Sequence, residues 1–479
     1  MSNNKSRREF LEKMVYGAGA LGLTSALAPG MAMADELAKF DDPLAPKQPH
    51  FPAKAKSVIW LHMAGAPSTI DLFDYKPELV RLHGKPIPES IAKNLKTATD
   101  GGVGTLLATN RTWKQYGESG AWFSDWVPNL SRHADNITFL KGSKTEGFTH
   151  VLSSLKLHTS GVTPGRPALG SWITYGLGSA NRDLPSFVVL PTGNDNAGGG
   201  RGPNLWGSGF LPATYQGTAL RQGGAPILNL DRPKDVSADE QRNTLDFLKK
   251  LNGFNQSKYP SDTELEARSR SYDLAYLMET SAPEAVSLDK ETAATKTAYG
   301  LDQDATREYG TNLLRARRLV ERGVRFVHVI SGSNDKKYGS WDAHSQIEKN
   351  HTVMTKAVDQ PIAALLDDLK ARGLLETTLV VWTSEFGRTP YGQTGDGRDH
   401  NPYGFTTWLA GGGTKAGFTH GATDDIGLKA VSGTFDTYDL QATVLNLLGL
   451  DHKKLIFQHN GRSERATTVF GDVIKEVIA

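Results

Sequence analysis

A group of polar residues follows an uninterrupted apolar segment near the end of the chain. The segment is 378–382, and Glu385, Arg388, Asp399 and His400 come soon after it. Carboxylates and imidazoles bind divalent cations, and a planar guanidinium matches the oxygens of a tetrahedral anion. Ligands of α/β proteins bind just beyond the ends of buried parallel strands. These residue types therefore predict part of a metal-assisted site for an anionic group.

Metal-compatible side chains also follow other apolar segments. Asp71 and Asp74 follow the segment 57–63, and Asp342 and His344 lie close together later in the chain. Each residue alone has a simpler explanation, because a loop aspartate often forms an Asx turn or caps a helix, and a lone histidine usually makes a local hydrogen bond. These residues would form one site only if the strand order of the sheet brings their strand ends together.

Three further residues have two interpretations each. Ser68 could act as a nucleophile or face a metal, but its position after a proline-containing turn favours capping of the following helix. Arg388 and Arg398 could hold a sulfate or phosphate through bidentate hydrogen bonds. Structural salt bridges from these arginines to Glu385 or Asp399 are an equally good interpretation.

Alternating strands and helices must position these residues. Strands are predicted at 57–63, 136–140, 186–190, 325–330, 378–382 and 406–410, and helices at 150–158, 353–372 and 438–448. Residues 235–322 are mostly helical by periodicity and form a predicted helical insertion, in which the arginines of 315–318 are interpreted as a solvated helix face. This alternation predicts an α/β fold with a mainly parallel central sheet and helices on both faces.

The composition excludes several classes of site and partner. The 479 residues carry a formal net charge of +2, so no general attraction to nucleic acid is expected. Cysteine is absent, which excludes disulfides, thiolate zinc sites and cysteine nucleophiles. Any metal must therefore be held by oxygen and nitrogen ligands, which admit calcium, magnesium, manganese or zinc.

The N-terminal segment has the features of an export signal. Residues 6–11 include paired arginines, the run 15–28 is weakly apolar and glycine-rich, and small residues occupy 32–34. This order predicts a twin-arginine signal at 1–34, recognised by the twin-arginine translocase. An anchoring helix is disfavoured, because the run is too short to cross about 30 Å of hydrocarbon. We expect residues 35–479 to form a single large domain in the periplasm or outside the cell, without a stable membrane anchor.

Several stretches spread over the chain resemble a known family. They lie at 65–77, 316–327, 341–344, 384–390 and 397–400. Together they resemble the large exported family called domain of unknown function 1501, over nearly the whole of the expected domain. That family is similar to the alkaline phosphatase and sulfatase superfamily, so the resemblance implies an alkaline-phosphatase-like fold. It also implies hydrolysis of phosphate or sulfate esters with one or two metal ions.

The resemblance implies roles for individual residues. The ligands of a divalent ion would be Asp342, His344, Asp399 and His400, followed by Glu385 and Asp71. His150 lies where the superfamily has its nucleophile, so it is a candidate general acid or ligand. Arg388 and Arg398 would offset charge on the transferred group, and Ser68 stays a candidate nucleophile.

The sequence also departs from the superfamily pattern in places that matter for mechanism. His62 ends the first predicted strand, where superfamily enzymes usually have an aspartate nearby. Glu385 and Phe386 replace the usual Asp-His pair, so one carboxylate is kept and the imidazole becomes a phenyl ring. The segment 149–161 contains no Cys/Ser-x-Pro-x-Arg motif, so formylglycine chemistry is not expected.

Two functions follow from these patterns. The first is an exported metal-dependent hydrolase of sulfate or phosphate esters, with a glycan ester among the candidate substrates because Trp206 lies in a predicted loop and could stack on a sugar ring. The second is a non-catalytic periplasmic binding or assembly protein that keeps the fold, which the replaced imidazole at Phe386 favours. The metal content of the protein would separate them.

Overall fold

The structure is a computed structural model that describes residues 42–92, 103–192, 202–221, 232–233, 235–258, 263–332, 339–393 and 395–479. The predicted export signal at 1–34 lies outside the described residues. Residues 43–479 form one compact unit. Within the described ranges, no helix is both long and apolar enough to cross a membrane.

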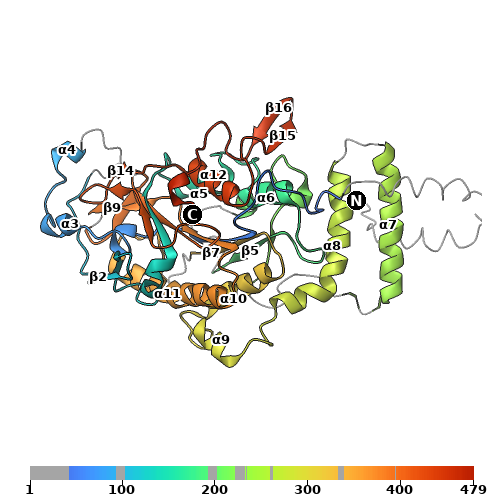
Figure 1. Ribbon diagram of the computed structural model, residues 1–479, viewed down its shortest axis with the longest axis horizontal. Helices are drawn as coiled ribbons and strands as arrows, with labels where there is room; N and C mark the ends of the chain where they lie inside the picture. The colour runs from blue at the N-terminus through green and yellow to red at the C-terminus, as the bar shows by residue number, and fades with distance from the viewer. Residues whose placement is uncertain are drawn as a thin grey trace, which may run out of the picture. The chain divides into compact units, whose positions relative to one another are not determined.

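The unit is built around a twisted, mainly parallel sheet (Figure 1). Its order is β12-β4-β11-β8-β1-β7-β5-β6, and β11 alone runs antiparallel to its neighbours β4 and β8. The strands of this sheet are β1 (Ser57–Met63), β4 (Ile137–Ser143), β5 (Phe187–Pro191), β6 (Thr218–Ala219), β7 (Phe326–Ser331), β8 (Thr378–Thr383), β11 (Phe405–Ala410) and β12 (Phe418–His420). The central strands β1 and β8 are mostly apolar and are buried along their whole length, as expected for strands covered on both faces.

Helices cover both faces of the sheet, which confirms the predicted α/β architecture. Figure 1 shows α10 (Arg307–Glu321) and α11 (Ile347–Ala371) on one side of the sheet. On the other side lie α5 (His150–Thr159), α6 (Leu169–Leu177) and α12 (Thr437–Leu447). Side chains alternate along each strand, so each face has its own apolar core.

The predicted helical segment 235–322 contains α7 (Ala238–Lys258), α8 (Thr263–Val286), α9 (Ala293–Ala298) and α10. The interpretation of its arginines as a solvated face was wrong for two of them. Arg317 and Arg318 are buried and both pair with Glu291, at 2.7 and 2.6 Å. Arg317 also pairs with Asp368 of α11 at 2.9 Å. Acidic partners distant in sequence therefore allow these cations to be buried between the helices, which local periodicity does not reveal.

Short elements complete the unit around the sheet. They are η2 (Thr69–Asp71), α3 (Pro77–Arg81), α4 (Glu89–Ala92), β2 (Trp113–Tyr116), β3 (Ala121–Ser124), η3 (Leu130–Asn136), η4 (Gly202–Leu205), η5 (Ala213–Tyr215), β9 (Gly387–Gly392), β10 (Arg398–Asn401), β13 (Ala422–Thr423), β14 (Ala430–Ser432), β15 (Ile456–His459), β16 (Arg462–Arg465) and η6 (Lys475–Val477). The polar segment after β8 forms an antiparallel ribbon of β9 and β10. This ribbon fixes the side chains after β8 more firmly than a loop would.

Candidate metal centre

Four of the predicted site residues come together at one end of the sheet. The Nε2 atoms of His344, His150 and His400 lie 2.8, 3.1 and 3.3 Å from the same atom, Asp342 Oδ1. The Nε2 atoms of His344 and His400 are 2.9 Å apart. We call these four residues the outer cluster. Their ligand atoms all lie within 4.8 Å of one another.

The outer cluster is drawn from separate parts of the chain. His150 is the first residue of α5, His400 lies in β10, and Asp342 and His344 precede α11. Two glycines allow these segments to approach. Gly65 has φ +116°, and a Cβ there would lie 3.0 Å from Asp342 N. A Cβ on Gly397 would overlap the backbone of His344 at 2.0 Å.

Each histidine of the outer cluster has its Nδ1 atom beside a hydrogen-bond acceptor. His150 Nδ1 donates to Glu385 Oε1 at 2.7 Å, and His400 Nδ1 donates to the carbonyl oxygen of Phe148 at 2.6 Å. His344 Nδ1 donates to the side-chain oxygen of Gln393. We assign the Nδ1–H tautomer to all three rings, because these acceptors have no proton to give. In the neutral rings, three Nε2 lone pairs then converge on Asp342.

The electrostatics of the outer cluster favour a bound cation. Burial lowers the pKa of His400 to about 4, so this ring is neutral near pH 7. Burial opposes the charge of His150, but hydrogen bonds to Asp342 and Glu385 raise its pKa. Burial acts against the charge of Asp342 also, yet the three imidazoles and Arg388 hold its pKa well below the usual range. A divalent ion can replace the proton of His150, because metal binding needs the neutral ring.

The donor set fits some metals better than others. Three imidazole nitrogens and one carboxylate oxygen suit zinc, whereas calcium and magnesium prefer all-oxygen sites. The side chains of His344 and Asp342 are 33 and 26% exposed, so the centre is open to solvent on one side. Such a centre can hold an ion and admit a small molecule to it. Glu385 and Phe386 are buried and close the opposite side.

Glu385 lies behind the outer cluster. Its Oε1 accepts from His150 Nδ1 and from the backbone N–H of Gly65 at 2.9 Å. Its Oε2 lies 3.2 Å from His62 Nε2. With only 2% of the residue exposed, the structure places Glu385 where it orients His150. The ring of Phe386 packs against His150 and His400, with centroids 4.8 and 4.5 Å away.

Asp399 also lies beside the outer cluster. The side chain is buried, and Oδ1 accepts the backbone N–H of His400 at 2.8 Å. The same oxygen is 4.0 Å from His344 Nδ1, on the side of that ring that faces away from Asp342. Asp399 therefore holds the backbone of His400 and lies near the ring of His344, and its carboxylate is not among the converging ligand atoms of the outer cluster.

The remaining predicted residues are buried and bond to one another or to Asp342. Asp71 accepts Arg398 Nε and Nη2 at 2.8 and 3.0 Å and Ser68 Oγ at 2.5 Å. The interpretation of Ser68 as a helix cap was wrong, since its side chain bonds to Asp71 and makes no capping hydrogen bond. Arg388 is buried; it donates to the carbonyl oxygens of Ala66 and Gly65 and to Asp342. The two arginines thus make structural salt bridges, with Asp71 and Asp342 as partners.

Sequence reasoning missed some contributors to the site. Gln393 lies in a glycine-rich turn, where an amide side chain has no distinguishing pattern. The Phe148 carbonyl belongs to the backbone, so no residue type signals its role. His62 was noted only as a departure from an aspartate, although a histidine ending a buried strand is itself a signal of a polar network.

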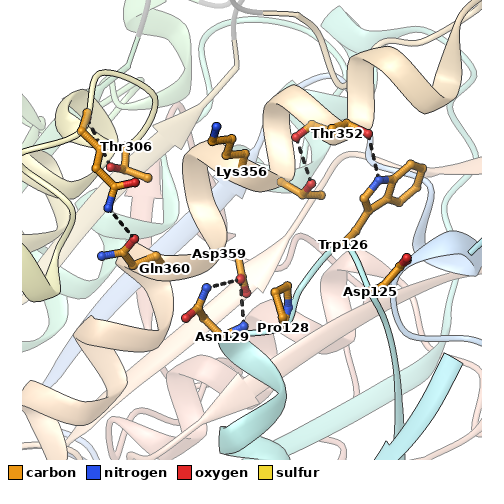
Figure 2. Close-up of a pocket in the computed structure, with 11 residues that line it drawn as sticks. Asp125, Trp126, Pro128, Asn129, Thr306, Thr352, Lys356, Asp359 and Gln360 are labelled. Carbon is orange, nitrogen blue, oxygen red and sulfur yellow. Dashed lines mark hydrogen bonds between the residues drawn. The ribbon is translucent and has the colours of Figure 1, made fainter. Parts of the chain in front are cut away.

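A cavity of about 250 Å³ lies elsewhere in the fold, between α11 and the segment that leads to η3 (Figure 2). Asp359 at its wall accepts the backbone N–H groups of Asn129 and Leu130 at 2.9 and 2.8 Å. Its carboxylate is therefore used to hold η3. The lining residues include none from the outer cluster. Trp206, the candidate for sugar stacking, is partly buried and packs against the core on the α6 face.

Comparison with known proteins gives one family match and several similar structures. The sequence profile of the family described as "Protein of unknown function (DUF1501)" matches residues 55–478. No curated protein matches the sequence. The PsFucS1 sulfatase from Pseudoalteromonas sp. is similar with a TM-score of 0.35 and 13% identity, over 88% of this chain and 71% of that chain.

Two further solved structures are similar at the same level. The lipoteichoic acid synthase LtaP from Listeria monocytogenes has a TM-score of 0.38 and 9% identity, over 93% of this chain and 82% of that one. The alkaline phosphatase from the Antarctic bacterium TAB5 has a TM-score of 0.34 and 12% identity, over 83% and 99%. Likeness at this level establishes no shared chemistry.

Proposed function

The chain belongs to the DUF1501 family, and we propose that it is a metal-dependent hydrolase of phosphate or sulfate esters. The observation that supports this proposal is the convergence of three Nε2 atoms on Asp342 Oδ1, with each Nδ1 atom beside an acceptor. With the assigned Nδ1–H tautomers bonded to Glu385, Gln393 and the Phe148 carbonyl, the neutral rings present three Nε2 lone pairs to an ion beside Asp342. Fixing a ligand tautomer through its second nitrogen is the usual construction of a metal site.

The residues of the chain have defined tasks in this proposal. His150, Asp342, His344 and His400 would hold the ion. When bound, a divalent ion supplies Lewis-acid polarisation of an ester oxygen and activation of water. Arg388 fixes the carboxylate of Asp342, and Glu385 fixes the ring of His150. The Ser68 hydroxyl is buried and bonded to Asp71, so we propose water as the nucleophile.

The proposal is tested by metal content and turnover in the same samples. Full-length protein loaded with Zn²⁺ would be assayed with 4-nitrophenyl phosphate and 4-nitrophenyl sulfate, which separate the two ester classes. His344→Ala should lose turnover by more than the roughly 10–100-fold expected for removal of an outer hydrogen-bond partner. His133→Gln is the matched control, because His133 is a buried histidine that bonds to the Ala363 carbonyl oxygen. Unchanged turnover in His344→Ala would contradict the proposal.

A second candidate function is favoured by the position of Phe386. Its phenyl ring lies against two rings of the outer cluster, so this position adds no metal ligand. A protein with one ion in the outer cluster and with its Ser68 hydroxyl bonded to Asp71 could bind an anionic ester or glycan without cleaving it. Tight binding without release of nitrophenol, in a zinc-containing sample, would select this function.

We also propose that the protein acts after export, because paired arginines precede the weakly apolar segment 15–28. Replacing Arg7 and Arg8 with lysine should keep the protein in the cytoplasm. Immunoblotting of periplasmic and cytoplasmic fractions measures this. A periplasmic pool that is unchanged in the double variant would exclude the twin-arginine translocase as the route.

A further inference from the structure

Three more histidines lie on the far side of Glu385 from the outer cluster. His62 is in β1, His158 is in α5 and His328 is in β7. Each is buried, and their ligand atoms all lie within 4.8 Å of one another. We call these three residues the inner cluster. None of the chemistry described above uses His158 or His328.

The sheet and α5 together build the inner cluster. β1 and β7 are parallel neighbours, and Trp60 lies opposite His328. Side chains alternate along each strand, so His62 lies on the same face as Trp60, diagonally beside His328. α5 packs on this face, where the ring of His158 lies 5.9 Å from that of Trp60. His158 follows His150 by eight residues, about 12 Å along the helix and on the same side of it, so one helix serves both clusters.

The contacts within the inner cluster assign its lone pairs. His62 Nε2 lies 3.2 Å from Glu385 Oε2 and donates its proton to that carboxylate. The Nδ1 atom of His62 therefore carries a lone pair and accepts a hydrogen bond from His158 Nε2 at 3.2 Å; a bound ion would replace the proton of His158 Nε2. The ring of His328 lies 4.4 Å from that of His158 and 5.7 Å from that of His62, measured between centroids.

His328 is the unexplained member of this group. Its residue exposure is 0%, and neither ring nitrogen has a hydrogen-bond partner. Buried polar atoms without partners are rare and costly, and an unseen ion or water is one of the usual reasons for them. Burial holds the pKa of His328 well below its ordinary value, so the ring is neutral and has a lone pair to donate.

We propose that His62, His158 and His328 bind a second divalent transition-metal ion, for which Zn²⁺ is the best match. Two nitrogens on one tetrahedral zinc lie about 3.3 Å apart, as calculated from Zn–N bonds of about 2.05 Å. The distance between His62 Nδ1 and His158 Nε2 is 3.2 Å. A site of three imidazoles excludes calcium and magnesium, which need oxygen ligands. Glu385 would serve as the carboxylate that orients a metal-bound histidine in both clusters.

The test counts zinc ions in the full-length protein. After loading with Zn²⁺ and gel filtration, mass spectrometry of the metal should find two ions in the wild-type chain. His344→Ala should keep one ion, His328→Leu should keep one, and the double variant should keep none. His133→Gln, which changes a buried histidine outside both clusters, should keep two. Circular dichroism of each variant establishes that it is folded.

A second measurement covers the case in which His328→Leu does not fold. X-ray absorption of zinc-loaded His344→Ala reads the ligands of the remaining ion in a chain whose inner cluster is intact. Coordination of the remaining zinc ion by three imidazole nitrogens supports the proposal. A zinc-free His344→Ala chain, or a remaining ion with a mainly oxygen shell, overturns it and leaves the inner cluster as a stack of neutral rings. A protein without ester turnover would still hold the inner ion, so this outcome is independent of the proposed hydrolysis.

Discussion

The carboxylate of Glu385 lies 2.7 Å from His150 Nδ1 and fixes the tautomer of that ring. The same carboxylate accepts the Gly65 N–H and faces His62 Nε2. Three donors therefore depend on one buried residue. Its negative charge also offsets part of the charge of any cation held by the rings in front of it.

Glu385→Gln should weaken zinc binding at the outer cluster by about 10–100-fold, the usual effect of losing an outer partner. Glutamine offers one acceptor oxygen, so its amide group must face at least one of the three donors. Chelator competition measures the zinc dissociation constant. Glu291→Gln is the matched control, since Glu291 is a buried carboxylate paired with Arg317 and Arg318. Equal zinc affinity in Glu385→Gln and wild type would refute this role.

Asp71 should prove to be a structural residue. It forms a bidentate pair with Arg398, and both side chains are at most 2% exposed. Asp71→Asn leaves the guanidinium buried without a countercharge, so the free energy of unfolding should fall by about 3–5 kcal/mol. Zinc content at native pH should not change. Urea denaturation and metal analysis measure the two quantities.

The exposed pair of Glu78 and Arg81 provides the comparison for Asp71. Glu78→Gln should change stability little, because solvent screens a surface pair. If Asp71→Asn instead lost zinc with little change in stability, Asp71 would be a ligand and the network with Arg398 would be secondary.

The sequence predicted the positions of strands and helices better than it predicted which distant residues contact one another. The runs at β1 and β8 are mostly apolar and uninterrupted by glycine or proline, so their positions could be read directly. Asp71 and Asp342 looked alike, as acidic residues near strand ends. They differ because Arg398 pairs with Asp71, whereas the three histidines of the outer cluster surround the carboxylate of Asp342. That difference depends on the strand order and on the ribbon of β9 and β10, which no local pattern encodes.

His351 should make the fold sensitive to acid. Its Nε2 accepts the Ser68 N–H at 2.9 Å, and burial lowers its pKa from the ordinary 6.5 to about 3. The unfolded chain therefore takes up a proton that the folded chain excludes. The stabilisation is complete above pH 6.5 and is lost as the pH falls toward 3. The slope from this residue is up to about 1.4 kcal/mol per pH unit.

His351→Gln isolates this effect, because the glutamine oxygen can still accept the Ser68 N–H but does not titrate. Urea denaturation of both proteins between pH 7 and about 3 gives the two curves. The free energy of unfolding of wild type should fall more steeply with acid than that of the variant. Parallel curves would show that His351 is protonated in the folded state.

Phe386 should stabilise the outer cluster by packing against two of its histidine rings. Its ring is 0% exposed and contacts His150 and His400. Aromatic pairs contribute about 0.5–1.5 kcal/mol each. Phe386→Leu should therefore weaken zinc binding by about tenfold, because the rings of His150 and His400 would be held less firmly. Phe123→Leu removes a buried ring that packs on Phe73 and Phe139 and serves as the control.

Phe386→His distinguishes a packing role of this residue from the loss of a metal ligand at the same position. If the phenyl ring had merely replaced a ligand, an imidazole there would tighten zinc binding. We expect weaker binding instead, because the side chain packs in an apolar group with Ala66 and Phe405, where an imidazole would be buried among apolar side chains. Chelator competition on both variants decides the question. Tighter binding in Phe386→His would show that the centre is an incomplete version of a larger one.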